Sequence, residues 1–326
     1  MLGHGPGVEL VAVALVALVA GAAVAGLGTE LEVDDGPDGE QLGRGLAAGV
    51  AGPLEAQQLP DGSGHAPEST RRHRGGRRRE NPPVALVSTT AFVLKVDPLS
   101  ERDLVTALLT KDHGVVRAAV KGARGRSRRA AALQTLNEVA ATYFRREGAD
   151  LARLDAAEVL RTSYELAGTP AAMLLPYLAE SALTFVPESE PGTEVYRLVR
   201  HVLDALLSGV EPGLAARYFE VWLLRLSGVL PEEERCATCG EPIGPGEARM
   251  DPRSPGICHA GCAGGAGLFV GEDARRLLRA IRRSPLPALG APEPGALSTV
   301  EAVAREARRR FLGHELRSYR LLGLLG

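Results

Sequence analysis

The four cysteines of the chain lie in two close pairs and could bind a metal ion. Two residues separate Cys236 from Cys239, and three separate Cys258 from Cys262. Two thiolate pairs about 15–20 residues apart have the donor set and the spacing of a tetrahedral zinc knuckle. All four donors are protein side chains, so such a site has no open position for water, which favours a structural metal over a catalytic one. The sequence therefore predicts one structural Zn²⁺ in the loop 236–262.

Alternatives to this ligand set remain open. The cysteines could form two disulfides or be unrelated thiols, although clustered cysteines with no others in the chain suit a reducing compartment. His259 lies inside the second pair, so it could replace a cysteine as the fourth ligand. Glycine and proline are frequent between the pairs, so we expect this interval to be loop rather than helix or strand.

A basic segment could bind nucleic-acid phosphates. No acidic residue occurs from His113 to Asn137, and the basic residues there are Arg117, Lys121, Arg124, Arg126, Arg128 and Arg129. The glycine-spaced loop from Lys121 to Arg129 can follow a phosphate backbone without fixing its geometry. The alternative is a solvated charged loop. Few aromatic residues lie nearby to stack on bases, so backbone binding with little sequence reading is expected.

The elements that must position these residues are strands first and helices later. Runs of β-branched and aromatic residues predict five short strands, at 89–96, 103–110, 115–121, 136–144 and 151–160. Five short strands predict a small closed barrel, of which the OB-fold is a common nucleic-acid-binding type. Helical spacing of apolar residues then appears at 170–185, 195–207, 215–226, 272–283 and 299–312. The predicted fold class is α+β, with an N-terminal OB-fold barrel followed by an α-helical domain that carries the zinc knuckle.

The chain is predicted to have three parts: an atypical extension 1–86, an OB-fold domain 87–165 and a helical domain 166–326. Of the 40 acidic and 38 basic side chains, residues 1–80 hold 11 and 7, which leaves 29 and 31 for the rest. The part expected to fold is therefore slightly positive. Residues 28–70 show no usable periodicity, which is typical of disorder.

The extension has three interpretations. Leu10–Leu27 is uncharged and borderline in length for a membrane anchor, but it lacks the basic region of a signal peptide. The basic run 71–79 could bind anionic lipid or nucleic acid. We favour the third, in which the segment is an upstream read-through of a GC-rich frame and translation starts at Val84 or Val87.

Motifs of catalysis are absent from the sequence. We find no phosphate-binding Gly-x4-Gly-Lys-Ser/Thr loop, no Gly-x-Gly-x-x-Gly, no His-Glu-x-x-His and no Gly-x-Ser-x-Gly. The deaminase zinc pattern is also missing. We therefore expect a protein that is not an enzyme; a zinc-dependent hydrolase is disfavoured because a closed metal site cannot bind water.

Four segments resemble, in order, the bacterial recombination mediator RecO. They are 89–103, 104–129, 216–240 and 311–322, and the resemblance covers about 87–322. It implies an OB-fold, a helical domain and a zinc knuckle. It also implies a cytoplasmic, nucleoid-associated protein that binds single- and double-stranded DNA, anneals complementary strands and helps to load RecA at gaps. The implied partners are RecR, the C-terminal peptide of single-strand binding protein and, indirectly, RecA.

The same resemblance implies roles for particular residues. The zinc ligands would be Cys236, Cys239, Cys258 and Cys262, and the basic face of the barrel would hold Lys95, Arg117, Lys121 and Arg124. The extension 1–86 departs from the family pattern. The competing hypothesis is a membrane-tethered, zinc-containing interaction scaffold, and cell fractionation would separate the two.

Overall fold

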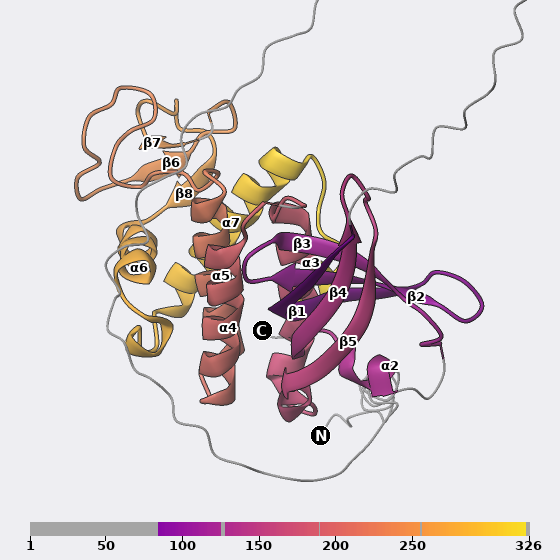
Figure 1. The fold of residues 1–326 in the computed structure, drawn as a ribbon. Coiled ribbons are helices and arrows are strands. Elements are labelled where there is room, and N and C mark those ends of the chain that lie inside the picture. The colour runs from indigo at the N-terminus through magenta and orange to yellow at the C-terminus, as the bar shows by residue number, and fades with distance from the viewer. Residues whose placement is uncertain (1–83, 125–127, 189, 255, 324–326) are drawn as a thin grey trace, which may run out of the picture. The chain divides into compact units, whose positions relative to one another are not determined.

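The structure is a computed structural model that describes residues 84–124, 128–188, 190–254 and 256–323. Five strands close into a barrel in the order β1-β2-β3-β5-β4 (Figure 1). They are β1 (Val84–Pro98), β2 (Leu104–Thr110), β3 (Gly114–Val120), β4 (Glu138–Arg146) and β5 (Ala152–Arg161). This order, with helix α2 (Arg128–Ala132) between β3 and β4, is that of an OB-fold, so the predicted barrel is confirmed.

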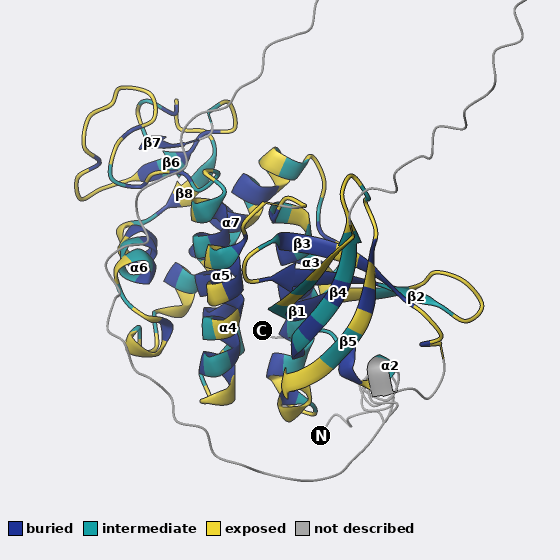
Figure 2. Ribbon diagram, viewed as in Figure 1, coloured by how far each residue is buried: buried dark blue, intermediate teal, exposed yellow. Residues whose placement is uncertain are grey.

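Side chains of the barrel wall alternate between its two faces, as strand geometry requires. Val93, Leu108 and Val116 belong to the apolar cluster inside the barrel. Phe92 and Leu109, one residue away along the same strands, belong to the core shared with the helices. Figure 2 shows this buried material along the strands and helices. One wall of the barrel is therefore covered by the helical part of the chain.

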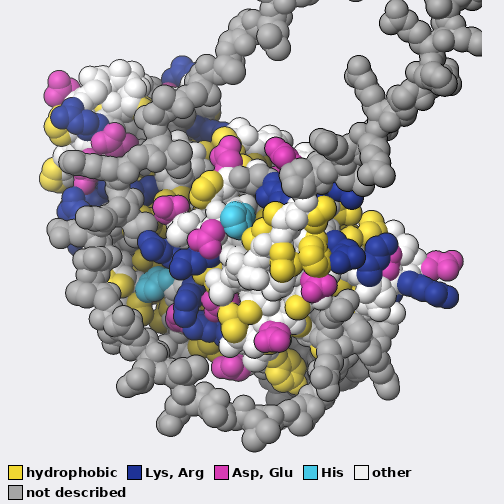
Figure 3. Space-filling view, viewed as in Figure 1, with side chains coloured by type: hydrophobic (Ala, Val, Ile, Leu, Met, Phe, Trp, Pro, Cys, Tyr) yellow, Lys and Arg dark blue, Asp and Glu magenta, His cyan; other side chains and the backbone are white. Residues whose placement is uncertain are grey.

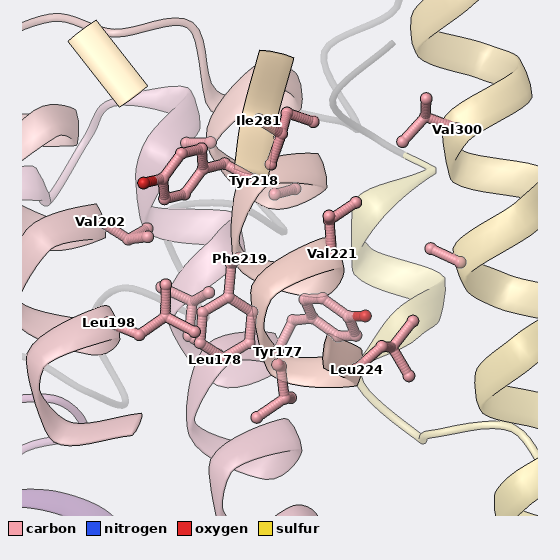
Figure 4. Packing of buried hydrophobic residues seen from close by; sticks show 14 of the residues in the cluster. Tyr177, Leu178, Leu198, Val202, Tyr218, Phe219, Val221, Leu224, Ile281 and Val300 are labelled. Carbon is pink, nitrogen blue, oxygen red and sulfur yellow. The ribbon is translucent and has the colours of Figure 1, made fainter. Parts of the chain in front are cut away.

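The second half of the described chain is helical, which confirms the α+β class. Its helices are α3 (Leu175–Phe185), α4 (Thr193–Leu207), α5 (Pro212–Leu226), α6 (Glu272–Arg283), α7 (Pro294–Leu312) and α8 (Tyr319–Leu322). Short 3-10 turns lie at Ser163–Leu166, Pro170–Leu174 and Leu286–Ala288. Apolar residues recur three and four positions apart, so each main helix buries one face. Tyr177, Leu198 and Phe219 come from three helices and share one apolar cluster (Figure 4).

Most of the interval between the cysteine pairs is loop, but it also contains strand β6 and the beginning of β7, so the expectation that it holds no strand was wrong. Strands β6 (Ala248–Met250), β7 (Ile257–His259) and β8 (Leu268–Val270) form a small sheet in the order β7-β6-β8. Three residues are too few for a strand pattern to stand out among glycines and prolines. Met250 and Ile257 are buried in the helical core, so the sheet holds the cysteine turns against the helices.

Two of the boundaries that differ from the sequence prediction lie in the barrel domain. β1 begins at Val84 rather than Thr89, because pairing with β4 from Val84↔Arg146 onward satisfies its backbone groups. The basic loop does not extend to Arg129, because α2 begins at Arg128.

Every helix in the described part of the chain is too short or too polar to cross a membrane. The candidate anchor 10–27 and the basic run 71–79 lie outside the described residues.

Candidate metal centre and nucleic-acid interface

Three thiols and one imidazole converge in the region of the cysteine pairs. The ligand atoms of Cys236, Cys239, His259 and Cys262 all lie within 4.8 Å of one another. Zinc bonds of about 2.0–2.3 Å in a tetrahedron put the ligand atoms about 3.5 Å apart, which is close to this arrangement. Thiolate and imidazole donors also suit zinc. The residues fit one structural Zn²⁺ with four protein ligands.

The hydrogen bonds of His259 fix which ring nitrogen could bind the metal. His259 Nε2 lies 3.1 Å from the carbonyl oxygen of Pro242, and a carbonyl can only accept, so Nε2 carries the proton. Nδ1 of the neutral ring then keeps its lone pair. That nitrogen lies 3.5 Å from Cys239 Sγ and 3.9 Å from Cys262 Sγ. A carbonyl that orients the second nitrogen is typical of metal-binding histidines.

Cys258 does not join this group, in contrast to the ligand set expected from the sequence. It is buried, and its Sγ lies 3.2 Å from Thr238 Oγ1. Successive side chains of a strand face opposite ways, so Cys258 and His259 of β7 point in different directions. The sequence does hold a signal for this, because two residues separate His259 from Cys262, as in the first pair.

The electrostatics of the centre favour an anionic thiol. Burial opposes ionisation of Cys236, but hydrogen bonds from the backbone N–H groups of Cys239, His259 and Thr238 lower its pKa to about 5. A hydrogen bond to Cys236, together with burial, raises the pKa of Cys262 to about 11. A cation bound at the centre would favour the ionised form of both thiols.

The turn that carries the first pair is positioned by glycine and by helix α6. Gly240 adopts φ of 77° and donates its N–H to the carbonyl oxygen of Cys236 at 2.9 Å, which closes the turn. Arg275 of α6 is 1 % exposed. Its guanidinium donates to the carbonyl oxygens of Ile243, Gly244 and Gly246 at 3.2, 3.1 and 3.0 Å. A buried side chain of α6 therefore fixes the loop that follows the turn.

On the barrel, two of the predicted DNA-binding residues lie in one cross-strand row. Lys95 of β1 and Arg117 of β3 both pair with Ala107 of β2. Directly paired residues share a face, so both cations project from the outer wall, on either side of a small side chain. Neighbouring strands are about 4.8 Å apart, which puts the two Cα atoms roughly 10 Å apart. Both side chains are more than half exposed.

Lys121 and Arg124 join the beginning of the basic loop to the loop between β1 and β2. Lys121 Nζ lies 3.2 Å from Asp103 Oδ2, and Arg124 Nη1 donates to the carbonyl oxygen of Ser100 at 2.8 Å. Asp103 also accepts the N–H of Gly122 at 2.9 Å, and this hydrogen bond, with the contact to Lys121, lowers the pKa of Asp103. The β1–β2 loop is one of the loops that OB-folds use for binding nucleic acids.

The remaining cations are paired or undescribed. Lys95 pairs with Asp97 at 2.8 Å, and Arg117 pairs with Glu188 at 2.6 Å. Exposed pairs of this kind contribute at most about 1 kcal/mol, so phosphates can replace the carboxylates. Figure 3 shows Lys and Arg side chains interspersed with Asp and Glu on the face drawn. Arg126 lies outside the described residues, and Arg128 and Arg129 are described as backbone positions of α2.

Comparison with known proteins assigns both halves of the described chain to one family. Residues 84–163 match the family described as "Recombination protein O N terminal", and residues 171–320 match "Recombination protein O C terminal". A protein named DNA repair protein RecO from Anaeromyxobacter sp. (strain K) is 34% identical over 232 residues, which cover 71% of this chain and 91% of the relative. The chain belongs to the RecO family.

Other members of the RecO family are similarly distant. The DNA repair protein RecO of Koribacter versatilis is 32% identical over 212 residues, which cover 64% of this chain and 86% of that protein. The one from Desulforudis audaxviator is 33% identical over 177 residues, which cover 53% of this chain and 69% of that protein. The N-terminal match contains the whole barrel, and the C-terminal match contains the candidate metal centre.

Two contributors to these sites were missed by reasoning from the sequence. Arg275 sits in an arginine-rich helix and is indistinguishable there from its exposed neighbours. Glu188 lies between two helices, and nothing in the sequence relates it to Arg117. Both act through contacts between residues far apart in the chain.

Proposed function

We propose that this chain is a DNA-binding mediator of repair and recombination that acts without catalysing a chemical step. The observation that carries the proposal is the cationic row Lys95–Ala107–Arg117 on an OB-fold barrel, with Lys121 and Arg124 beside it. Phosphate contacts of this kind bind DNA in a sequence-independent and salt-dependent way. Membership of the RecO family supports the same role.

We further propose that the protein anneals complementary strands. Cations on the barrel would neutralise the phosphates of two strands and so reduce the repulsion that opposes pairing. The proposal includes RecR and single-strand binding protein as partners, and RecA as the recombinase that is loaded at gaps. It also includes a cytoplasmic, nucleoid-associated location. No step of this activity requires ATP, which agrees with a sequence that has no nucleotide-binding loop.

A groove between α7 and the β6–β8 sheet is suited to the C-terminal peptide of single-strand binding protein. Its volume is about 480 Å³, and Met250 and Leu268 contribute an apolar lining. Arg305 and Arg309 of α7 line the same groove and are exposed, and each is ion-paired, Arg305 with Glu315 and Arg309 with Glu306, so a peptide carboxylate would have to replace a carboxylate of the protein. A C-terminal peptide brings a carboxylate, which guanidinium groups bind well.

The test of the proposal is annealing of complementary oligonucleotides coated with single-strand binding protein, without ATP, at two salt concentrations. We expect the full chain to accelerate annealing, and the acceleration to weaken at higher salt. Lys121→Glu/Arg124→Glu should lower affinity for single-stranded DNA roughly tenfold, because two phosphate contacts are lost.

The matched control reverses two exposed arginines of α6 in Arg276→Glu/Arg283→Glu, which makes the same change in net charge. We expect this control to bind DNA much as the wild type does. If both double variants lose the same affinity, the barrel face is not the interface. If the folded, zinc-loaded wild type gives no acceleration, the annealing role is wrong.

A further inference from the structure

One predicted phosphate-binding residue is already in contact with an anion of the protein itself. Arg117 is the exposed residue of β3, and its Nε lies 2.6 Å from Oε1 of Glu188. Glu188 belongs to the linker between α3 and α4, in the helical half of the chain. A carboxylate on the arginine of an OB-fold wall takes the position that a nucleic-acid phosphate would need.

The linker is anchored beside this arginine by backbone contacts. β2 pairs with β3 along its whole length, but β5 pairs with the other edge of β3 only at Ala118 and Ala119, so this second edge is open at the beginning of β3. Glu188 forms isolated β-bridges with Gly114 and Val115 at this open edge. Covering an open strand edge in this way is a common device.

The first residue of β3 leaves room for the linker between α3 and α4. Gly114 has φ of 63°, and a Cβ there would lie 1.9 Å from the carbonyl oxygen of Glu190. At the end of the linker, Thr193 Oγ1 donates to the carbonyl oxygen of Lys111, between β2 and β3, at 2.9 Å. The backbone around Glu188 is thus held at the barrel, and rotation of its side chain alone can free Arg117.

The ion pair lies in a polar hollow at the place where OB-folds bind their ligands. The hollow has a volume of about 180 Å³ and is lined by Arg117, Arg145, Glu188 and the β4–β5 loop residues Gly148 to Asp150, among others. The outer face of β2 and β3 and the β4–β5 loop are typical contact regions of nucleic acids on this fold. Two basic residues, Arg117 and Arg145, and two acidic residues, Glu188 and Asp150, therefore line the same small hollow.

We propose that this hollow is a phosphate subsite and that Glu188 acts as an internal competitor for it. The inference rests on the proposed DNA-binding function. A nucleic-acid phosphate displaces the Glu188 carboxylate from Arg117, so the ion pair reduces affinity for DNA and makes binding more readily reversible. Glu188 is therefore an affinity-determining residue rather than part of the binding surface.

The experiment measures binding of a labelled oligothymidine to the full, zinc-loaded chain by fluorescence anisotropy. Glu188→Gln keeps the shape of the side chain and removes its charge. We expect affinity to rise about two- to fivefold, as the loss of one exposed ion pair allows. Arg117→Gln should weaken binding and make the slope of log K against log salt shallower by about 0.7.

The matched control is Glu190→Gln, which makes the same change in net charge in the same linker. Glu190 is exposed, and its carboxylate has no ion pair among the described residues. Its affinity gain should be smaller than that of Glu188→Gln. In an Arg117→Gln background, the gain from Glu188→Gln should fall to the level of the control.

The outcomes separate this inference from the function on which it rests. Equal gains for the two glutamate variants, with salt-sensitive binding by the wild type, would overturn the role of Glu188 and leave the DNA-binding function intact. Absence of salt-sensitive binding by the folded wild type would overturn both.

Discussion

At the scale of single residues, neighbouring side chains of β7 have opposite environments. His259 Nδ1 faces two thiols, whereas Cys258 is buried against Thr238. Residue type alone favours the cysteine as a zinc ligand, but the direction of each side chain decides between them. The structure gives that position to His259.

If His259 rather than Cys258 binds the metal, two alanine substitutions should differ in their effect on zinc affinity. Loss of a residue that only hydrogen-bonds to a metal ligand lowers metal affinity about 10–100-fold. His259→Ala removes a ligand itself, so its loss of zinc affinity should be larger. Cys258→Ala should still bind one zinc ion per chain. Competition with a chromophoric chelator measures both affinities. Loss of zinc from Cys258→Ala, with retention by His259→Ala, would restore the four-cysteine site.

His201 links the stability of the fold to pH. His201 Nε2 accepts the N–H of Leu286 at 3.3 Å, so the neutral ring is the form that fits. Burial lowers the pKa of His201, although nearby Asp204 opposes this. The folded protein therefore binds a proton less readily than the unfolded chain. At a pH well above the ordinary pKa of histidine, this residue does not affect stability. As pH drops below about 6.5, the unfolded chain binds the proton more readily and stability falls.

Replacing this histidine should remove part of the pH dependence. The free energy of unfolding of the wild type should decrease between about pH 7.5 and about pH 5.5 by more than that of His201→Gln. The variant should therefore be more stable, relative to the wild type, at the lower pH. Urea titrations of both proteins at both pH values, with zinc in excess, measure the difference. If the free energies of unfolding of the two proteins differ by the same amount at both pH values, His201 does not titrate in this range.

At the scale of elements, buried charges join three helices. Arg308 of α7 is paired with Glu220 of α5 at 2.9 Å, and both are 2 % exposed. Tyr177 of α3 donates to the same carboxylate, and Arg217 of α5 pairs with it at 2.8 Å. A carboxylate with three partners fixes the relative register of these helices.

Removing one member of this network should be costly. Arg308→Met leaves the Glu220 carboxylate buried with one cation fewer, and we expect a loss of about 3–5 kcal/mol in the free energy of unfolding. Arg308→Met/Glu220→Met removes both charges and should lose less than the sum of the two single variants. Urea unfolding provides the numbers; strict additivity would mean that the two side chains do not interact.

At the scale of the whole described molecule, two apolar clusters divide the stabilising contacts. One fills the barrel. The other runs from the outer barrel wall through the helices to Ile243, Met250 and Val270 beside the metal centre. Loss of the metal should therefore affect the helical core before the barrel interior.

Chelation of zinc tests this division. After treatment with a strong chelator, amides of 236–262 should exchange hydrogen faster, followed by those of α6, because Arg275 of α6 holds the cysteine loop. Amides of β2 and β3 inside the barrel should keep their protection, and single-stranded DNA binding should persist. Simultaneous loss of protection in the barrel and the metal region would show a single cooperative unit.

Much of the fold was predictable because its signals are local. Strands β2 to β5 and helix α6 were placed close to their observed bounds, since strand alternation and helical spacing act over a few residues. The strands β6, β7 and β8 were missed because three-residue strands depend on their partners rather than on their own pattern. The extension of β1 to Val84 likewise depends on β4.

Residue types and their spacing along the chain indicate the chemistry available to this protein: thiols with an imidazole for a metal, and a run of cations for phosphate. The same local signals predict the barrel strands that carry the cations, but not the strand β7 that carries His259. Folding turns His259 rather than Cys258 toward Cys236, Cys239 and Cys262, and it brings Glu188 to Arg117. The physical reason is that spacing and composition act along the chain, whereas ligand geometry and ion pairing act through space between residues that folding brings together.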